Sequence, residues 1–255
     1  MEHSNHGLRV LVTGGSRGIG SAIVRCLADA GYDVQFIYNK SVEPAEALLK
    51  ELRAGYSGQT FSAHQVDLGA RAAVDAFADF LSEESALYAY VHNAGQSYDT
   101  LAALADQSRT EAIMQVNFLS LTKLVTAVLR PMMRAKSGRV VNIGSITALR
   151  GTPGNSIYAA TKGAAQSYMS TLAVEIAPKG ITANTIAPGY VDTDLLKLYS
   201  DHRATMEKQI PAGRFAQPEE IAALVRYLLC PEASYVTGSV IPVDGGLMAS
   251  LTGRR

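Results

Sequence analysis

A tyrosine and a lysine four positions apart are the side chains of this sequence best suited to proton transfer. Tyr158 and Lys162 end the stretch that begins at Ser145, and on a helix they would project from one face. A lysine ammonium beside a phenol favours the phenolate, so we expect Lys162 to lower the pKa of Tyr158 from its free value of about 10. Tyr158 would then act as a general acid or base. The alternative is that the pair simply decorates a helix surface.

A glycine-rich segment near the start of the chain could bind phosphate. Residues 8–12 form a short apolar, β-branched run, and the segment Thr13-Gly-Gly-Ser-Arg-Gly-Ile-Gly20 follows it before apolar residues recur at helical spacing. This order predicts a strand, a tight turn and a helix. Glycines allow such a turn and let main-chain N–H groups approach a pyrophosphate at the helix amino terminus. The spacing departs from Gly-x-Gly-x-x-Gly, so a plain structural turn is the alternative to dinucleotide binding.

The end of the second predicted strand, residues 34–38, bears on the choice of cofactor. An acidic side chain there would hold the ribose 2′-hydroxyl of NAD, but Tyr38 and Asn39 occupy the place. No carboxylate would repel a 2′-phosphate, and Arg17 and Lys40 could pair with one. We therefore predict NADP(H) as the cofactor, with NADPH preferred over NADH. The alternative is that both cations are solvated surface charges.

Two further predicted strands end in residues that could line the same edge of a sheet. The strand at 61–66 is followed by Asp67 and Leu68. Asp67 could accept a hydrogen bond from an adenine amino group, or it could cap the next helix. The strand at 87–91 runs into His92-Asn-Ala-Gly95, where small residues permit the close approach of a ligand or another backbone.

The second half of the chain continues the alternation. A long helix is predicted at 109–133, where Asn117 interrupts a wide apolar face and must find hydrogen-bond partners, for which backbone groups are the simplest candidates. Charged, irregular sequence at 190–214 is typical of a lid over a substrate. The other predicted elements are helices at 44–54, 71–81 and 219–229 and strands at 139–143, 181–186 and 240–243.

Short strands alternating with helices predict a parallel, doubly wound α/β sheet of Rossmann type, with about seven strands and helices on both faces. The 255 residues are 47% hydrophobic, enough for one large core, so we expect a single dinucleotide-binding catalytic domain over 1–255. Charged residues are only 18%, with 23 basic against 23 acidic. Such a balance creates no field that would attract nucleic acid or an anionic membrane.

The cysteines, histidines and apolar runs bear on metals and on the compartment. Cys26 and Cys230 lie far apart in apolar helical patterns, which favours buried thiols in a reducing compartment over a disulfide. The five histidines make no ligand spacing typical of a metal site. Residues 1–7 lack the apolar core of a signal peptide, and we expect no apolar run long enough to span a bilayer. A cytoplasmic protein is expected.

Taken together, the motifs resemble those of the short-chain dehydrogenase/reductase family from residue 10 to residue 246. The matching features are Thr13-Gly-x-x-x-Gly18-x-Gly20, Asp67, Asn93-Ala-Gly95, Asn117, Ser145, Tyr158-x-x-x-Lys162, and Pro188-Gly189 with Thr193. One departure is His92, where the family often has a second asparagine. The cofactor-binding residues that the resemblance and the turn motif imply are Gly14, Ser16, Arg17, Gly18, Ile19, Gly20, Tyr38, Asn39, Lys40, Asp67, Leu68, Asn93, Ala94, Gly95, Tyr158, Lys162, Pro188, Gly189, Val191 and Thr193.

The resemblance also implies catalytic roles. Tyr158 would protonate a substrate carbonyl oxygen as hydride arrives from a nicotinamide. Lys162 would depress the tyrosine pKa and hold the nicotinamide ribose, while Ser145 would hydrogen-bond the carbonyl. Asn117 would anchor a water that links Lys162 to solvent.

Within the family the chain is most similar to the β-ketoacyl-[acyl-carrier-protein] reductases of fatty-acid synthesis. That similarity implies reduction of a 3-oxoacyl thioester, with Lys136 and Lys179 receiving an acidic acyl carrier protein; the alternative is that both are solvated charges. It also implies a homotetramer. A small free ketone, alcohol, sugar or steroid is the alternative substrate, and a polyketide-type pathway is an alternative to primary lipid synthesis. A non-catalytic dinucleotide-binding regulator would be expected to lose Ser145, Tyr158 or Lys162.

Overall fold

The sheet has seven parallel strands. In the computed structural model, which describes residues 5–84, 87–193 and 202–250, the strand order is β3-β2-β1-β4-β5-β6-β7. Buried β-branched and other apolar residues fill the central strands, as expected for strands covered on both faces. The strands are β1 (Arg9–Thr13), β2 (Asp33–Tyr38), β3 (Phe61–Gln65), β4 (Ala89–His92), β5 (Gly138–Ile143), β6 (Ile181–Pro188) and β7 (Val240–Val243).

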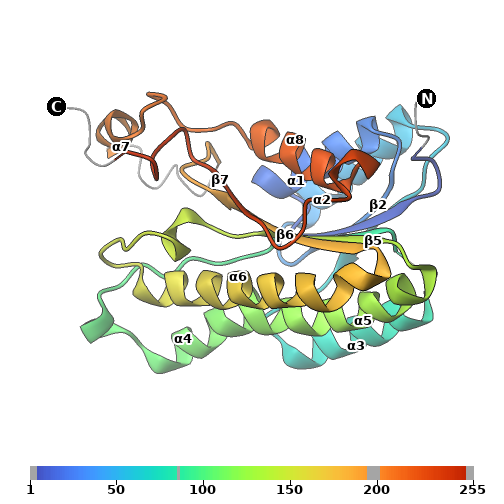
Figure 1. Cartoon of the computed structure of the whole chain (residues 1–255), viewed down its shortest axis with the longest axis horizontal. Helices are drawn as coiled ribbons and strands as arrows, with labels where there is room; N and C mark the ends of the chain where they lie inside the picture. The colour runs from blue at the N-terminus through green and yellow to red at the C-terminus, as the bar shows by residue number, and fades with distance from the viewer. Residues whose placement is uncertain (1–4, 85–86, 194–201, 251–255) are drawn as a thin grey trace.

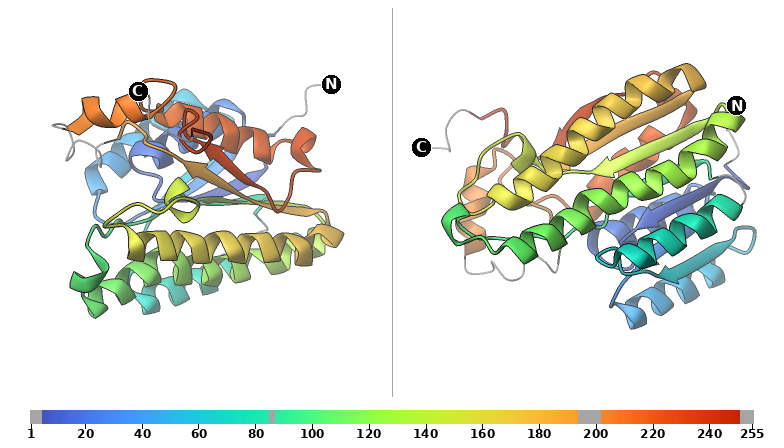
Figure 2. Two further views of the ribbon diagram at one scale, coloured as in Figure 1. Left: turned by 60° about the vertical axis from the view of Figure 1, so that its left-hand side comes forward. Right: turned by 90° about the horizontal axis from the view of Figure 1, so that it is seen from below.

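Helices cover both faces of the sheet, which confirms the predicted doubly wound α/β class (Figure 1). One core cluster lies under α1 (Gly18–Asp29), α2 (Val42–Gly55) and α8 (Pro218–Leu229). The other lies under α3 (Arg71–Glu83), α5 (Ser120–Ala135) and α6 (Ser156–Ile176), which run side by side across the lower face (Figure 2).

The strand order reverses between β1 and β4, which are neighbours although β2 and β3 separate them in sequence. In sheets of this kind, ligands bind beyond the carboxyl ends of the strands at such a switch point. The glycine turn follows β1, and the His92-Asn-Ala-Gly95 segment follows β4. The topology therefore brings these two motifs to one place.

The predicted long helix is not regular. It extends from Gln107 to Ala135 as α4 (Gln107–Met114), a π-helix (Gln115–Leu119) and α5. The π-helix contains Asn117, and such turns occur frequently at functional sites. By length and composition this run could cross a membrane, so the expectation that no apolar run reaches that length is wrong. Half of its apolar window is buried, and α5 packs on α3 and the sheet, as a core helix does.

Two other expectations need adjustment. The cysteines are free within the described chain, but both are only partly buried, and Cys230 lies just beyond the last residue of α8. Burial raises the pKa of each thiol. The predicted lid at 190–214 contains the helix α7 (Arg203–Gln209); its part at 194–201 lies outside the described residues.

Candidate active site

The glycine turn is built to admit a ligand close to its backbone. Gly14 has a φ of 65°, which favours glycine. A β-carbon added at Gly20 would lie 2.0 Å from the Gly14 oxygen, and one at Gly15 would lie 2.5 Å from Cβ of Phe36. The turn thus packs tightly against β2, and no side chain in the described structure caps the first N–H groups of α1. This cradle fits the pyrophosphate of a dinucleotide.

Thr13 and Asn93 join the turn to the end of β4. The Thr13 hydroxyl oxygen accepts hydrogen bonds from the main-chain N–H groups of Asn93 and Ala94, both at 3.0 Å. In return, the Asn93 amide donates to the main-chain oxygens of Thr13 and Gly14. Sequence reasoning placed Thr13 in the motif but gave it no role. Its β-branched hydroxyl type at a strand end was the available signal.

The residues predicted to select the cofactor lie at the carboxyl end of β2 and at the turn. Arg17 is exposed at the start of α1, and Lys40 is exposed two residues beyond β2. The Asn39 amide donates to Asp67 at 3.0 Å, and Asp67 also accepts from the N–H of Gly69. Asp67 therefore does not cap α3 with its side chain. Its bond from Asn39 joins the segment after β2 to the segment after β3.

Ser145 lies near enough to the Tyr158 phenol to affect its pKa. Ser145 follows β5 in extended conformation, and its hydroxyl oxygen accepts from both the N–H and the hydroxyl of Thr147, at 3.2 and 2.9 Å. Both lone pairs are then engaged, so the Ser145 hydrogen is left to be donated to a neighbouring oxygen. Thr147 was missed by sequence reasoning, because an ST-type turn gives no distinctive spacing.

The pKa of Tyr158 is shifted in the direction opposite to the sequence prediction. Burial raises the pKa of the phenol, and the hydrogen bond from Ser145 opposes part of the rise. Lys162 does lie on the same face of α6, but its Nζ is 5.8 Å from the centre of the Tyr158 ring. Desolvation thus outweighs any effect of the ammonium. The proton stays on Tyr158 at neutral pH.

Lys162 is buried, with 4% of its surface exposed. Its ammonium donates a hydrogen bond to the main-chain oxygen of Ile143 at 2.9 Å. Burial lowers the pKa of Lys162 to about 8. A β-carbon at Gly95 would lie 3.2 Å from Nζ, so the small residue after β4 makes room for the ammonium.

Asn117 joins three elements. Its side-chain oxygen accepts from the N–H of Gln96, and its amide nitrogen donates to the Gln96 oxygen and to the Thr161 hydroxyl, all at 2.8–2.9 Å. Thr161 in turn donates to the main-chain oxygen of Tyr158. The fully buried amide is thus satisfied largely by backbone, and it fixes the start of α6 to the loop after β4.

His92 is fully buried and neutral. Its Nδ1 lies 2.8 Å from the Tyr90 hydroxyl, and its Nε2 has no hydrogen-bond partner among the described residues. Burial, with a smaller contribution from the charge of Lys162, lowers the pKa of His92 to about 3. The departure from the family pattern at this position therefore adds no charge to the site.

The chain after β6 folds back over the glycine turn. Gly189 has room only for hydrogen, since a β-carbon there would lie 2.9 Å from Cα of Asp244. The methyl group of Thr193 lies 3.3 Å from the β-carbon position of Gly18. The segment after β6 therefore lies at the same edge of the sheet as the glycine turn. It contains four of the predicted cofactor residues: Pro188, Gly189, Val191 and Thr193.

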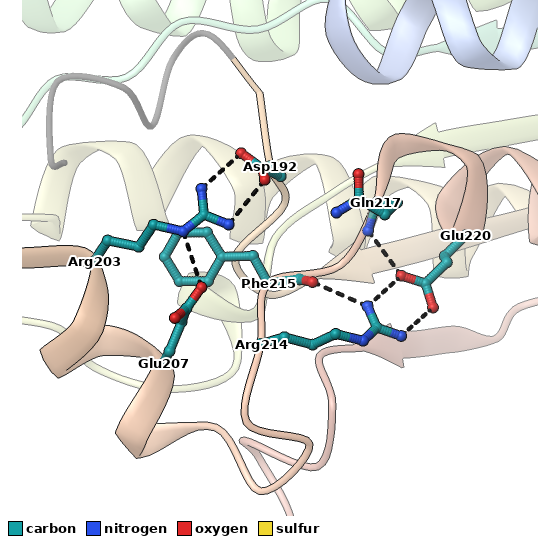
Figure 3. Close-up of polar contacts among 7 residues, drawn as sticks. All are labelled: Asp192, Arg203, Glu207, Arg214, Phe215, Gln217 and Glu220. Carbon is teal, nitrogen blue, oxygen red and sulfur yellow. Dashed lines mark hydrogen bonds and ion pairs between the residues drawn. The ribbon is translucent and has the colours of Figure 1, made fainter.

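Two arginines in the segment from residue 203 to residue 214 form ion pairs with neighbouring carboxylates (Figure 3). Arg203 pairs with Asp192 and Glu207, and Arg214 pairs with Glu220. Of the predicted lid, α7 and the turn that follows it are therefore anchored segments in the described structure.

Lys136 and Lys179 lie together, but far from Tyr158 of the same chain. Lys136 ends α5 with a φ of 52°, and its main-chain oxygen is 2.7 Å from the β-carbon position of Gly180. Both lysines precede strands, at the amino edge of the sheet. Tyr158 lies at the opposite end of α6, whose 21 residues span roughly 30 Å.

The remaining predicted cofactor residues also lie at the carboxyl edge. Ser16 and Ile19 belong to the turn and the first turn of α1, Leu68 follows β3, and Ala94 and Gly95 follow β4.

Comparison with known proteins agrees with this arrangement. The sequence model of a family described as "Enoyl-(Acyl carrier protein) reductase" matches residues 14–248. The chain is 37% identical over 239 residues to the 3-oxoacyl-[acyl-carrier-protein] reductase FabG of Chlamydia trachomatis serovar D, covering 93% of this chain and 96% of that protein. The protein of the same name from Vibrio cholerae serotype O1 is 35% identical over equal shares.

Solved structures agree as well. A short-chain dehydrogenase/reductase from Serratia marcescens is 31% identical, with a TM-score of 0.88, and the match covers 96% of this chain and 99% of that one. Another structure, titled "short chain dehydrogenase/reductase family protein", is 32% identical with a TM-score of 0.87, over 97% and 100% of the two chains. With the glycine turn, Ser145, Tyr158 and Lys162 assembled at one edge, this chain belongs to the short-chain dehydrogenase/reductase family.

Proposed function

We propose that this protein reduces a 3-oxoacyl thioester, carried on acyl carrier protein, to the 3-hydroxyacyl product with NADPH. The observation that carries the proposal is the placement of the Ser145 and Tyr158 hydroxyls near each other, beside the buried ammonium of Lys162. Two hydroxyl donors that meet at one point suit a single carbonyl oxygen. The relatives named 3-oxoacyl-[acyl-carrier-protein] reductase support this substrate class.

When bound at the glycine turn, the nicotinamide cofactor would supply the hydride for the substrate carbon. Ser145 donates a hydrogen bond to the carbonyl oxygen and fixes it beside Tyr158. Tyr158 holds its proton at neutral pH because burial raises its pKa, so it delivers that proton as negative charge develops on the oxygen. Lys162 would hold the nicotinamide ribose, and its positive charge would stabilise the phenolate that remains. Asn117 anchors a water through which the tyrosine is reprotonated.

The matching family is described by the name of an enoyl reductase, and the site favours carbonyl reduction. Protonation at oxygen is what a paired serine and tyrosine perform. In enoyl reduction, hydride goes to a carbon that is remote from the thioester oxygen. That carbon bears no oxygen, so the reaction does not require two hydroxyl donors beside it. Crotonyl thioester should therefore be a poor substrate.

The proposed preference for NADPH over NADH rests on Arg17 and Lys40. Both side chains are exposed at this edge of the sheet, and no carboxylate follows β2 directly. Asp67, which follows β3 at this edge, accepts hydrogen bonds from Asn39 and Gly69. Arg17→Ala should lower the ratio of kcat/KM for NADPH to that for NADH by roughly 10-fold, since charged hydrogen bonds contribute about 1.5–3 kcal/mol. A ratio that favours NADH in the unaltered enzyme would overturn the preference.

The carrier-protein contact at Lys136 and Lys179 can serve only a neighbouring subunit. The two lysines lie at the far end of α6 from Tyr158 of their own chain. We propose a cytoplasmic homotetramer in which α5 and α6 pack antiparallel on a second copy, so that each lysine pair lies near the other copy's site. Light scattering tests the assembly. Reversing both charges should raise KM for a carrier-bound substrate and leave a small thioester unaffected; equal effects would refute the contact.

The deciding assay follows NADPH absorbance with an acetoacetyl thioester and, in parallel, with a panel of free ketones and crotonyl thioester. Turnover of the 3-oxoacyl thioester at least ~10-fold more efficient than any free ketone is expected. Greater efficiency with a small ketone, alcohol, sugar or steroid would place the enzyme in the other substrate class.

A further inference from the structure

Asp192 stands between two residues of the proposed cofactor site. Val191 is buried at 5% exposure, and Thr193 places its methyl group 3.3 Å from the β-carbon position of Gly18. The main chain of this segment is tied to a later one, because the Asp192 N–H donates to Ala216 and the Ala216 N–H donates to Tyr190, at 2.8 and 2.9 Å. Whatever holds Asp192 therefore also sets the position of Thr193 over the glycine turn.

Arg203, at the start of α7, grips the Asp192 carboxylate with two parallel hydrogen bonds. Nη1 and Nη2 donate to the two carboxylate oxygens at 2.9 and 2.8 Å, and Nε donates to Glu207 at 2.9 Å (Figure 3). A bidentate arginine fork specifies both distance and orientation. The two acidic partners raise the pKa of Arg203, so its charge is constant.

The guanidinium of Arg203 is also seated on an aromatic ring. Its central carbon is 4.7 Å from the centre of the Phe215 ring, and that ring is 5.5 Å from Tyr190. Phe215 is 2% exposed. Arg203 thus joins three segments of the substrate side: the residue before Thr193, helix α7 and the buried ring that follows α7.

We propose that Arg203 is a positioning residue that couples the substrate side to cofactor binding, by holding Asp192 so that Thr193 stays over the glycine turn. The proposal rests on the proposed function, which places the dinucleotide at that turn. A lysine at position 203 keeps the charge but loses the fork and its fixed orientation. If the bidentate contact with Asp192 is required, Arg203→Lys should weaken NADPH binding although the positive charge is kept.

The alternative is that Arg203 only stabilises α7 through its pair with Glu207, four residues along the same helix. Glu207→Gln distinguishes the two explanations, since it removes the ion pair within α7 and leaves the bonds from Arg203 to Asp192. A matched control is Arg214→Lys. Arg214 also forms a fork, with Glu220 at 2.7 and 2.8 Å, but that partner belongs to α8 and does not border Thr193.

The experiment measures the dissociation constant of NADPH by fluorescence titration of the purified full chain, together with thermal unfolding. Arg203→Lys and Asp192→Asn should each weaken NADPH binding by about 3- to 10-fold. Because both act on one contact, the double variant should be no weaker than the poorer single variant. Glu207→Gln and Arg214→Lys should bind NADPH as the unaltered protein does. Unfolding temperatures should agree among the singles.

The coupling would be overturned by unchanged NADPH binding in Arg203→Lys, or by weakening that is additive in the double variant. Equal weakening in Glu207→Gln would assign the effect to helix stability and would also overturn it. The proposed function fails separately, if the unaltered chain does not bind NADPH at all. KM for the acetoacetyl thioester should rise with the NADPH dissociation constant in Arg203→Lys, whereas kcat at saturation should change less than ~2-fold.

Discussion

The Lys162 ammonium donates its hydrogen bond to the main-chain oxygen of Ile143, at 2.9 Å, and lies 5.8 Å from the centre of the Tyr158 ring. The lysine is therefore attached to the end of β5, and the tyrosine is paired with Ser145. The two side chains that define the motif act through separate contacts. In this arrangement Lys162 is a buried cation held at the site for a ligand that meets it there, and its burial is costly.

Lys162→Met should abolish turnover and yet raise stability at pH 7. The pKa of Lys162 is about 8 in the folded chain, below the value of 10.5 expected when unfolded. Below pH 8 both states carry the proton, so the full cost of burying the charge is present. Between pH 8 and 10.5 the unfolded state binds more protons, and the stability of the unaltered protein rises with pH.

The advantage of Lys162→Met in unfolding free energy should therefore be largest at pH 7 and shrink by pH 9.5. Urea denaturation at the two pH values measures it, and a turnover assay should find a loss of ~100-fold or more. Lys123→Met, at an exposed lysine paired with Asp75, is the control and should show no such pH dependence. An advantage that is constant with pH would contradict the lowered pKa.

Tyr158→Phe should remove the proton donor without disturbing the cofactor site. A general acid typically contributes about 10²–10⁴-fold, so kcat should fall by that factor while the NADPH dissociation constant stays within ~2-fold. Ser145→Ala should lower kcat by roughly 10²-fold, as expected for one lost hydrogen-bond donor to the developing oxyanion.

A third variant, Thr147→Val, tests how Ser145 is oriented. It removes one of the two donors to the Ser145 oxygen, and the serine hydrogen is then less constrained. A kcat loss intermediate between that of Ser145→Ala and no effect is expected from steady-state kinetics.

Near-normal turnover in Tyr158→Phe would refute the assignment of Tyr158 as the general acid.

The sheet and its helices could be predicted from the sequence, because each depends on a local pattern. Apolar β-branched runs and glycines determine β1 and the turn within a dozen residues. The pKa of Tyr158 was predicted in the wrong direction, because burial depends on how α6 packs on β5. Spacing shows that Tyr158 and Lys162 share a face, but not that Lys162 bonds to Ile143.

Contacts between distant segments were also invisible in the sequence. The π-helix that contains Asn117 lies where α4 and α5 join. The Asn117 amide donates its hydrogen bonds to Gln96 in the loop after β4 and to Thr161 in α6. The separation of Lys136 from Tyr158 follows from the direction of α6 relative to the strands. No pattern of residue types along the chain encodes either relationship.

His92→Asn should make the protein less sensitive to acid. The pKa of His92 is about 3 when folded, below the 6.5 of an exposed histidine. Between those values the unfolded state binds more protons, so stability rises with pH and is lost as pH falls below about 6.5, by up to about 1.4 kcal/mol per pH unit. The variant should lose less stability between pH 6.5 and 5, measured by urea denaturation. Equal slopes for both proteins would contradict a buried neutral histidine.

Two glycine-to-alanine substitutions should change the stability of the folded protein in opposite directions, because the surroundings of the two glycines differ. At Gly20 a β-carbon would lie 2.0 Å from the Gly14 oxygen and 2.6 Å from the Asn93 amide nitrogen. Backbone on one side and a bonded side chain on the other leave no room, so Gly20→Ala should destabilise by ~3 kcal/mol or more and abolish NADPH binding. At Gly163, inside α6, no heavy atom of the described chain comes within 4 Å beyond the helix itself.

Gly163→Ala should therefore stabilise the protein by about 0.5–1 kcal/mol, the helix preference for alanine over glycine. Urea denaturation and NADPH fluorescence titration of both variants measure the contrast, and Gly163→Ala should bind NADPH normally. Tight binding by Gly20→Ala would show that the turn can yield, and the pyrophosphate cradle would then have to be placed elsewhere. Destabilisation by Gly163→Ala would instead indicate that another copy of the chain packs against α6 at that point.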